Sequence, residues 1–143
     1  MAKDHFPVEE FRCKDGTPYP EEWVETRLPG LKRVLEVIRE RCGGLPVTVL
    51  CGYRSPAYNE RLRKRGLQGE GKTGVAEHSQ HMEGNAADIT IHGLSLSETL
   101  SEILAAWREG LLPELGGVGY YPNHGFIHVD TYRVGGRLRR WNG

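Results

Sequence analysis

Two residues that can bind a metal ion, His81 and Asp88, stand seven positions apart in the sequence. Zinc takes nitrogen and oxygen ligands at roughly 2.0–2.2 Å, so two ligands of one ion lie within about 3–4 Å of each other. Along a straight helix, seven residues would separate their Cα atoms by about 10.5 Å. The chain must therefore turn between them, and Gly84 and Asn85 are residue types that accept the positive φ angles of a turn.

A third candidate ligand, His128, lies in a run that alternates like a β-strand. Phe126, His128 and Asp130 are spaced two apart and share one face, whereas Ile127 and Val129 point toward the core. A histidine and an aspartate on one strand face are hard to explain by packing alone, and the alternative is a surface pair at a sheet edge. We expect the three residues to bind one zinc ion and to leave one position open for water, as catalytic sites do. A histidine and an aspartate seven residues apart, such as His81 and Asp88, also occur by chance in many proteins.

The elements that must position these residues follow from the pattern of the chain. Apolar spacing predicts two main helices, over about 31–42 and 95–108, and a shorter one from Pro56 to about Arg65. Ser95 and Glu98 have the spacing of a capping box. A buried strand is predicted at 46–50, a strand start at Asp88, and a hairpin over 116–130. The Gly-rich residues 66–74 are interpreted as a mobile loop beside the site.

The two ends of the chain give weaker signals. Residues 1–19 are expected to form an irregular entry segment anchored by Phe6 and Phe11, and a helix start is predicted at Pro20. Residues 131–143 are interpreted as a solvated C-terminal extension in which Trp141 docks. The arginines there are the alternative signal for a nucleic-acid patch.

The composition restricts the class of protein. A chain of 143 residues predicts a single domain, 1–143, with a core of its own. Nineteen basic and nineteen acidic residues cancel, which argues against a nucleic-acid or polyanion binder. No apolar run reaches the length of a membrane span, and the first residues do not resemble a signal peptide. Cys13, Cys42 and Cys51 are interpreted as small buried residues, with a disulfide from Cys13 to either of the others left open. We expect a monomer.

Three separated blocks carry a family resemblance. They are Gly52-Tyr53-Arg54-Ser55-Pro56-Ala57-Tyr58-Asn59, then Ser79-x-His81-x-x-Gly84-x-Ala86-x-Asp88, then Gly117-Val118-Gly119-Tyr120-Tyr121-Pro122 with Phe126-x-His128-x-Asp130. Together they resemble the zinc D-Ala-D-Ala carboxypeptidase-like peptidases, whose fold the Hedgehog signalling domain shares. Within that family they resemble the murein endopeptidase/carboxypeptidase subgroup ending in Phe-x-His-x-Asp. The resemblance covers about residues 47–130 and implies a small α+β domain, with an antiparallel sheet carrying the zinc site and helices on its other side.

The resemblance also implies residue roles. His81, Asp88 and His128 match the zinc ligands, Arg54 matches an arginine that binds a substrate carboxylate, and Ser79 matches a residue lining the same pocket. Tyr120 is expected to flank the peptide, with Tyr121 as the alternative. Cys51 stands where relatives often have serine.

The general base is the main departure from the family pattern. Many relatives carry an acidic residue three positions before the last zinc histidine, where this chain has Gly125. Asp130 is the first candidate, although its carboxylate can instead orient His128. Glu77 and His124 are the alternatives.

The function implied is zinc-dependent hydrolysis of peptide bonds in peptidoglycan stem peptides. A carboxypeptidase, an L,D-endopeptidase and a D,D-endopeptidase are all compatible with the sequence. Such a substrate would place the protein's action in the periplasm or cell wall. A catalytically inactive zinc-containing module that binds peptide or cell wall is the alternative, and a soluble α+β domain with structural histidines is a third interpretation.

Overall fold

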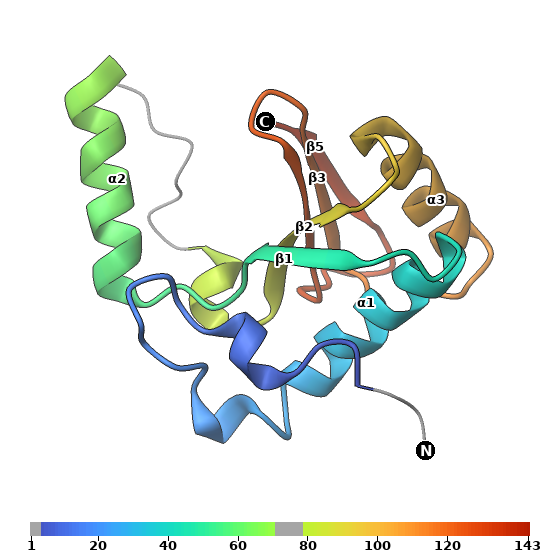
Figure 1. Ribbon diagram of the computed structural model, residues 1–143, viewed down its shortest axis with the longest axis horizontal. Helices are drawn as coiled ribbons and strands as arrows, with labels where there is room; N and C mark the ends of the chain where they lie inside the picture. The colour runs from blue at the N-terminus through green and yellow to red at the C-terminus, as the bar shows by residue number, and fades with distance from the viewer. Residues whose placement is uncertain (1–3, 71–78) are drawn as a thin grey trace.

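A five-stranded sheet forms the centre of the computed structural model, which describes residues 4–70 and 79–143 (Figure 1). The strands are β1 (Val47–Cys51), β2 (Ala86–Ile91), β3 (Gly117–Tyr121), β4 (Phe126–Asp130) and β5 (Arg139–Asn142). The helices are α1 (Leu28–Arg41), α2 (Pro56–Glu70) and α3 (Leu96–Arg108), with short 3₁₀ turns η1 (Val8–Phe11), η2 (Glu21–Trp23) and η3 (Gln80–Glu83). The spatial order is β1-β2-β4-β3-β5, antiparallel except for β5, which runs parallel to β3. The α+β prediction is confirmed.

One face of the sheet packs on α1 and α3 and holds the apolar core. The predicted apolar stripe of α1 is fully buried, and so are Ile103 and Ala106 of α3. Ile127 and Val129 contribute to this face from β4, as their alternation predicted. Ser95 caps α3 in the predicted capping box with Glu98.

The opposite face of the sheet carries the candidate ligands. In the register of β2 with β4, Asp88 lies directly opposite His128. Residues opposite each other on antiparallel strands put their side chains on the same face. The pairing of β2 with β4 therefore sets His128 beside Asp88, although 40 residues separate them in the chain. β3 and β4 form the hairpin that the sequence predicted.

β1 differs from the buried strand that was predicted. It lies at an edge of the sheet, pairs within the described residues with β2 alone, and leaves 37% of Leu50 exposed. A β-bulge after Val49 shifts the register so that Cys51 pairs with Asp88. The extra residue changes which face the following side chains point to, and it brings Cys51 to the side of the candidate ligands.

Two segments that were predicted to be irregular contain regular secondary structure. α2 continues through Gly66 to Glu70, so residues 66–70 of the predicted mobile loop are helical, while residues 71–74 lie outside the described part of the chain. Glycine weakens a helix by about 1 kcal/mol without removing a hydrogen bond, so Gly66 does not have to end it. The predicted C-terminal extension contains β5, which is not a solvated tail.

The remaining local predictions concern the N-terminal part and the cysteines. Phe6 and Phe11 are buried anchors, as predicted, and the helix start predicted at Pro20 is the short turn η2. All three cysteines are free thiols. Of the helices the structure describes, none is long and apolar enough to cross a membrane.

Candidate functional site

The turn predicted between His81 and Asp88 is built by η3 and a glycine. Ser79 caps η3 by accepting a hydrogen bond from the His81 backbone N–H at 3.1 Å. Gly84 ends it in the left-handed region at φ +71°, and its carbonyl accepts from the Tyr19 hydroxyl at 2.5 Å. Every positive φ among the described residues belongs to a glycine, so Asn85 does not adopt the conformation considered for it. The turn returns the chain directly into β2.

The three predicted ligands converge. Nε2 of His81 and Nδ1 of His128 each lie 3.1 Å from the same oxygen, Oδ1 of Asp88. The two imidazole rings are 5.1 Å apart and nearly perpendicular. All three side chains are almost entirely buried.

The outer nitrogen of each imidazole contacts a group that can only accept a hydrogen bond. Nδ1 of His81 is 2.7 Å from the carbonyl oxygen of Gly52, and Nε2 of His128 is 2.8 Å from Oδ2 of Asp130. Each outer nitrogen therefore donates, and in the neutral ring the nitrogen facing Asp88 keeps its lone pair. Two lone pairs and a carboxylate oxygen pointing at one another repel unless a cation lies among them. The donor set fits a zinc ion.

The same arrangement shifts the titration of these groups. Burial alone would lower the pKa of His81, but the negative charge of Asp88 outweighs it and raises that pKa. For Asp88, burial raises the pKa and the two imidazoles more than reverse this, so its pKa lies well below the usual value. The pocket thus favours positive charge between the rings and Asp88.

Asp130 lies on the far side of the His128 ring and is completely buried. Its Oδ1 accepts from the Tyr132 backbone N–H at 3.0 Å and from the Arg139 guanidinium, and its Oδ2 accepts from His128. Burial raises the pKa of Asp130, but the hydrogen bond from His128 and the charge of Arg139 hold it below its usual value. Both oxygens are engaged, which favours the alternative in which Asp130 orients His128.

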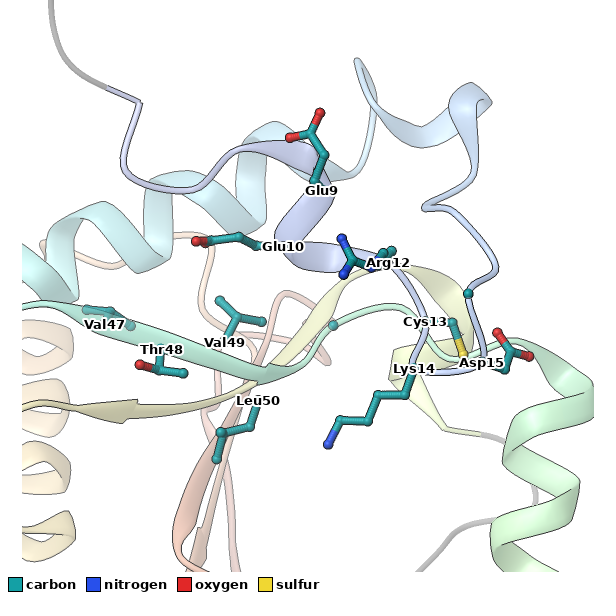
Figure 2. A pocket seen from close by; sticks show the side chains of 12 residues that line it. Glu9, Glu10, Arg12, Cys13, Lys14, Asp15, Val47, Thr48, Val49 and Leu50 are labelled. Atoms are coloured by element: carbon teal, nitrogen blue, oxygen red, sulfur yellow. The ribbon is translucent and has the colours of Figure 1, made fainter.

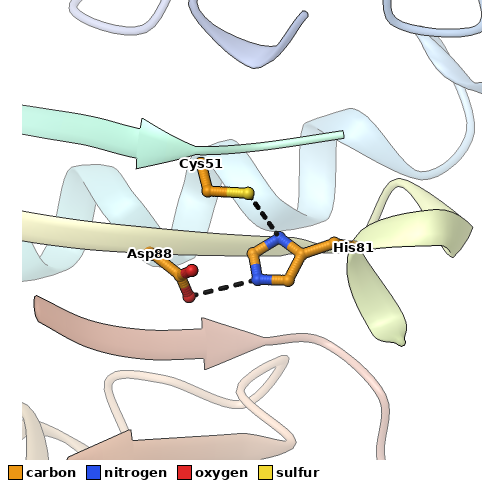
Figure 3. Close-up of side chains that lie close together, drawn as sticks. All are labelled: Cys51, His81 and Asp88. Carbon is orange, nitrogen blue, oxygen red and sulfur yellow. Dashed lines mark hydrogen bonds and ion pairs between the residues drawn. The ribbon is translucent and has the colours of Figure 1, made fainter. Parts of the chain in front are cut away.

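Cys51 was not among the predicted ligands, yet its thiol joins the same cluster (Figure 3). Ligand atoms of Cys51, His81 and Asp88 all lie within 4.8 Å of one another. The sulfur lies 3.7 Å from Nδ1 of His81, the nitrogen that faces Gly52. Because His128 faces Asp88 directly, we favour the two imidazoles and Asp88 as the metal ligands. Only the bulge in β1 brings Cys51 here, and the alternation of the strand gave no sign of it.

A cavity of about 270 Å³ opens over the ligands. Its walls include Arg54, Ser79, Tyr121, Phe126 and Trp141. Ser79 therefore lies where it was predicted.

Tyr121, not Tyr120, lines the cavity. Tyr120 pairs with Ile127 across the hairpin and packs against the core face, because neighbouring residues of a strand point to opposite sides. Tyr121 pairs with Phe126 and stacks on its ring at 4.7 Å. The tyrosine beside the ligands is therefore Tyr121, the alternative, and not Tyr120 as predicted.

The C-terminal strand supplies a wall that the sequence did not reveal. The Trp141 ring lies 5.2 Å from that of His128, and its N–H donates to the Tyr121 hydroxyl at 2.8 Å. A Cβ at Gly119 would lie 2.6 Å from the indole nitrogen, and one at Gly117 would lie 2.8 Å from the Asp130 carboxylate. The glycines of β3 make room for these side chains, and Gly117-Val118-Gly119 was the available signal.

Arg54 follows the end of β1, as predicted, and lies beside the ligands. Its guanidinium donates to Asn59 Oδ1 at 3.1 Å and to the Cys51 sulfur at 3.5 Å. Its Nε is buried and has no hydrogen-bond partner among the described residues. Burial raises the pKa of the Cys51 thiol, but the His81 hydrogen bond and the nearby charges of His81 and Arg54 reverse this and lower it.

The two other candidate bases are His124 and Glu77. His124 is exposed in the turn between β3 and β4 and lines an outer cavity that also includes Arg54 and Asp88. Glu77 lies outside the described residues.

A groove runs beside β1, between that strand and the N-terminal segment (Figure 2). Its volume is about 920 Å³. Lys14 and Leu50 line both this groove and the outer cavity that reaches Asp88. The two hollows thus meet at these residues.

The sequence of this chain is similar to a family of known proteins. A family model described as peptidoglycan L,D-endopeptidase MepK, of the M15 peptidases, matches residues 24–141. The probable peptidoglycan L,D-endopeptidase MepK of Haemophilus influenzae is 40% identical over 97 residues, and MepK of Escherichia coli K12 is 38% identical over 96. These alignments cover 68% and 67% of this chain but 43% of each relative, so the chain spans less than half the length of the curated relatives it matches.

The same fold occurs in a solved structure, the L-Ala D-Glu endopeptidase ChiX of Serratia marcescens. The two chains superpose with a TM-score of 0.51 at 20% sequence identity, over 88% of this chain and 93% of that one. The likeness supports the fold. Because the family match spans well over half of the sequence, the chain belongs to the MepK-like branch of the M15 peptidases.

Proposed function

We propose that this protein is a zinc-dependent peptidoglycan peptidase that cleaves stem peptides as an L,D-endopeptidase. The observation that carries the proposal is the convergence of His81, Asp88 and His128, with each outer imidazole nitrogen held by an acceptor. Family membership and the names of the relatives support the substrate class and the type of bond. The sequence alone left a carboxypeptidase and a D,D-endopeptidase open.

The metal and its ligands have distinct parts in this proposal. Zinc bound by His81, Asp88 and His128 would lower the pKa of a water ligand toward neutrality and polarise the scissile carbonyl. Gly52 holds His81, and Asp130 holds His128, in the tautomers that present a lone pair to the site. Trp141 covers the other side of His128 and limits the movement of its ring.

Arg54 is the group we propose to bind a substrate carboxylate. Its guanidinium is positively charged and lines both cavities over the ligands, and within residues 4–70 and 79–143 its Nε has no hydrogen-bond partner. A charge-assisted hydrogen bond from arginine to a carboxylate can be bidentate, which fixes orientation as well as position. Ser79 and Tyr121 line the same space and offer hydroxyl groups to the peptide.

Three groups are candidates for the general base: Asp130, His124 and Glu77. Asp130 has both oxygens engaged and is shielded by the His128 ring, so we assign it to positioning. That leaves His124, at the rim of the outer cavity, and Glu77 as the candidates for accepting the proton.

An inactive zinc-containing module that binds peptide or cell wall is the second candidate. It is favoured by Gly125, where many relatives carry an acid, and by the engaged oxygens of Asp130. In this case the site would bind stem peptides without cleaving them.

One experiment separates these functions. The purified protein is loaded with zinc, its metal content is measured, and it is incubated with a defined mixture of muropeptides whose products are identified by mass spectrometry. We expect one zinc per chain and products of cleavage at an L,D bond, both lost with chelator. Products that lose only a terminal D-Ala at a D,D bond would indicate a carboxypeptidase, and zinc and peptide binding without products would indicate the module. Absence of stoichiometric zinc at neutral pH would contradict both.

The proposed substrate also suggests where the protein acts. Peptidoglycan as substrate would place the activity in the periplasm or cell wall. As the assembly state we propose a monomer.

A further inference from the structure

The groove beside β1 meets the outer cavity, which Asp88 also lines, at Lys14 and Leu50. One of its walls is β1, from Val47 to Leu50, and the other is the N-terminal segment (Figure 2). Leu50 lies where the groove meets the outer cavity, and 37% of this large apolar side chain is exposed. An extended chain lying along β1 would cover the apolar side chain of Leu50, and Lys14 and Leu50 connect the groove to the outer cavity that Asp88 lines.

Five charged residues line the groove: Glu9, Glu10, Arg12, Lys14 and Asp15. Arg12 lies between Glu10 and Lys14 (Figure 2). Lys14 lies at the end near Leu50 and shares the outer cavity with Arg54, so two cations stand close to the ligands. Glu10 lies farther along, over the first half of β1 (Figure 2). Asp15, which also lines the groove, is engaged by Ser55 and Arg61. Within residues 4–70 and 79–143, neither Lys14 nor Glu10 forms an ion pair.

We propose that this groove binds the stem peptide in an extended form, with Lys14 holding a carboxylate near the scissile bond and Glu10 holding an amine farther away. The proposal rests on the proposed function, because the peptide must lead to the metal site. It specifies a zwitterionic substrate, with an acid close to the cleaved bond and a basic group several residues along. Stem peptides that contain a diamino acid have groups of both kinds.

The first test changes Lys14. Binding is measured by fluorescence anisotropy with a labelled stem peptide whose scissile amide is replaced by a reduced, non-hydrolysable bond. A second probe has its carboxylates amidated. We expect Lys14→Gln to weaken binding of the acidic peptide about tenfold, the loss of one charge-assisted hydrogen bond, and to leave the amidated peptide unchanged. On a cleavable peptide, KM should rise with kcat unchanged, because Lys14 touches no reacting atom.

The second test changes Glu10 in the same assay. Glu10→Gln should weaken binding of a peptide carrying a free side-chain amine and have no effect once that amine is acetylated. Lys64→Gln, which removes an exposed lysine of α2 away from the groove, is the matched control and should change neither probe.

The outcomes separate this proposal from the proposed function. Equal affinity of wild type and Lys14→Gln for the acidic peptide overturns the groove proposal while leaving cleavage at the zinc site intact. Equal loss with acidic and amidated probes overturns it as well. If the wild type cleaves no muropeptide yet shows the Lys14 effect, the groove proposal is supported and the enzymatic function fails. If the wild type binds neither probe, the groove proposal is overturned.

Discussion

The two faces of the sheet are built from alternate residues of the same strands and are buried to similar extents. On β4, Ile127 and Val129 are completely buried on the helix face, and His128 and Asp130 are 8% and 0% exposed on the other. The apolar pair packs on side chains of α1 and α3. The polar pair makes specific contacts: Nδ1 of His128 lies 3.1 Å from Oδ1 of Asp88, and the Asp130 carboxylate accepts hydrogen bonds from Tyr132 and Arg139.

The comparison shows that buried side chains on the two faces must satisfy different requirements. On the helix face, a side chain needs the right volume and no polar atom, and neighbours of similar shape can replace it. On the ligand face, each buried polar atom needs a partner at the right place, because an unpaired buried group costs about 1–3 kcal/mol and a charged one more. Substitutions on the helix face should therefore lower mainly the stability of the fold, and substitutions on the ligand face should lower mainly zinc binding and activity.

Removal of a metal ligand should have the largest effect and should act on the ligand face alone. His128→Ala should lower turnover of muropeptides on the order of a thousandfold or more, since a metal site supplies several kcal/mol of transition-state stabilisation. Stoichiometric zinc should be lost in the same variant, as measured by atomic emission. The circular dichroism of the folded domain should persist. Full activity and full zinc content in this variant would remove His128 from the site.

A substitution one residue away should have the opposite pattern. Ile127→Ala should lower the free energy of unfolding by about 2–5 kcal/mol, because it leaves a cavity under α1 and α3. Zinc bound per folded molecule should stay at the wild-type value below the denaturation midpoint. Urea unfolding followed by fluorescence gives the first quantity, and metal analysis of the folded fraction gives the second. A zinc loss comparable to that of His128→Ala would mean that the faces are not separate.

The role of Asp130 sharpens the comparison further. If Asp130 positions His128, Asp130→Ala should weaken zinc affinity or activity by about 10–100-fold, and Asp130→Asn should recover part of the loss because its amide oxygen can still accept from Nε2. The acidic limb of the profile of kcat/KM against pH should remain in Asp130→Asn. Disappearance of that limb, with zinc still bound, would instead make Asp130 the general base.

The pH dependence of stability offers a check on the same residue. The folded pKa of Asp130 is lowered, so its contribution to stability is present above the unfolded value near 3.8 and is lost as the pH falls through the folded value. Acid unfolding of metal-free protein should therefore lose part of its slope below about pH 4 in Asp130→Asn. Identical slopes in the two proteins would show that the carboxylate gains nothing from its partners.

The smallest expected effect concerns the C-terminal strand. Trp141→Phe keeps an aromatic ring beside His128 but removes the N–H that donates to Tyr121, and should cost about 0.5–1.5 kcal/mol of stability. Tyr121→Phe should cost about the same, and the double variant should cost no more than either alone. Thermal unfolding of the four proteins forms the cycle. Additive losses would show that this hydrogen bond does not couple β3 to β5.

Much of the fold could be predicted because it depends on periodicity. The apolar spacing of α1 and α3, the capping box at Ser95 and the alternation of β4 each report a local choice that the final structure keeps. The turn between His81 and Asp88 could be predicted from reach alone, and Gly84 supplies it. In the same way, alternation placed His128 and Asp130 on one face before the partner strand was known.

Other features depended on contacts between distant segments. The bulge in β1 that brings Cys51 to Asp88 is a matter of register with β2, and the pairing of β5 with β3 depends on the space left by Gly117 and Gly119. The choice of Tyr121 over Tyr120 followed from the register of the hairpin. The sequence by itself determined which residue types could bind a metal and how each strand alternates, because both are properties of neighbouring residues. Only the tertiary structure decided which atoms meet, because register and strand order are set by packing between segments far apart in the chain.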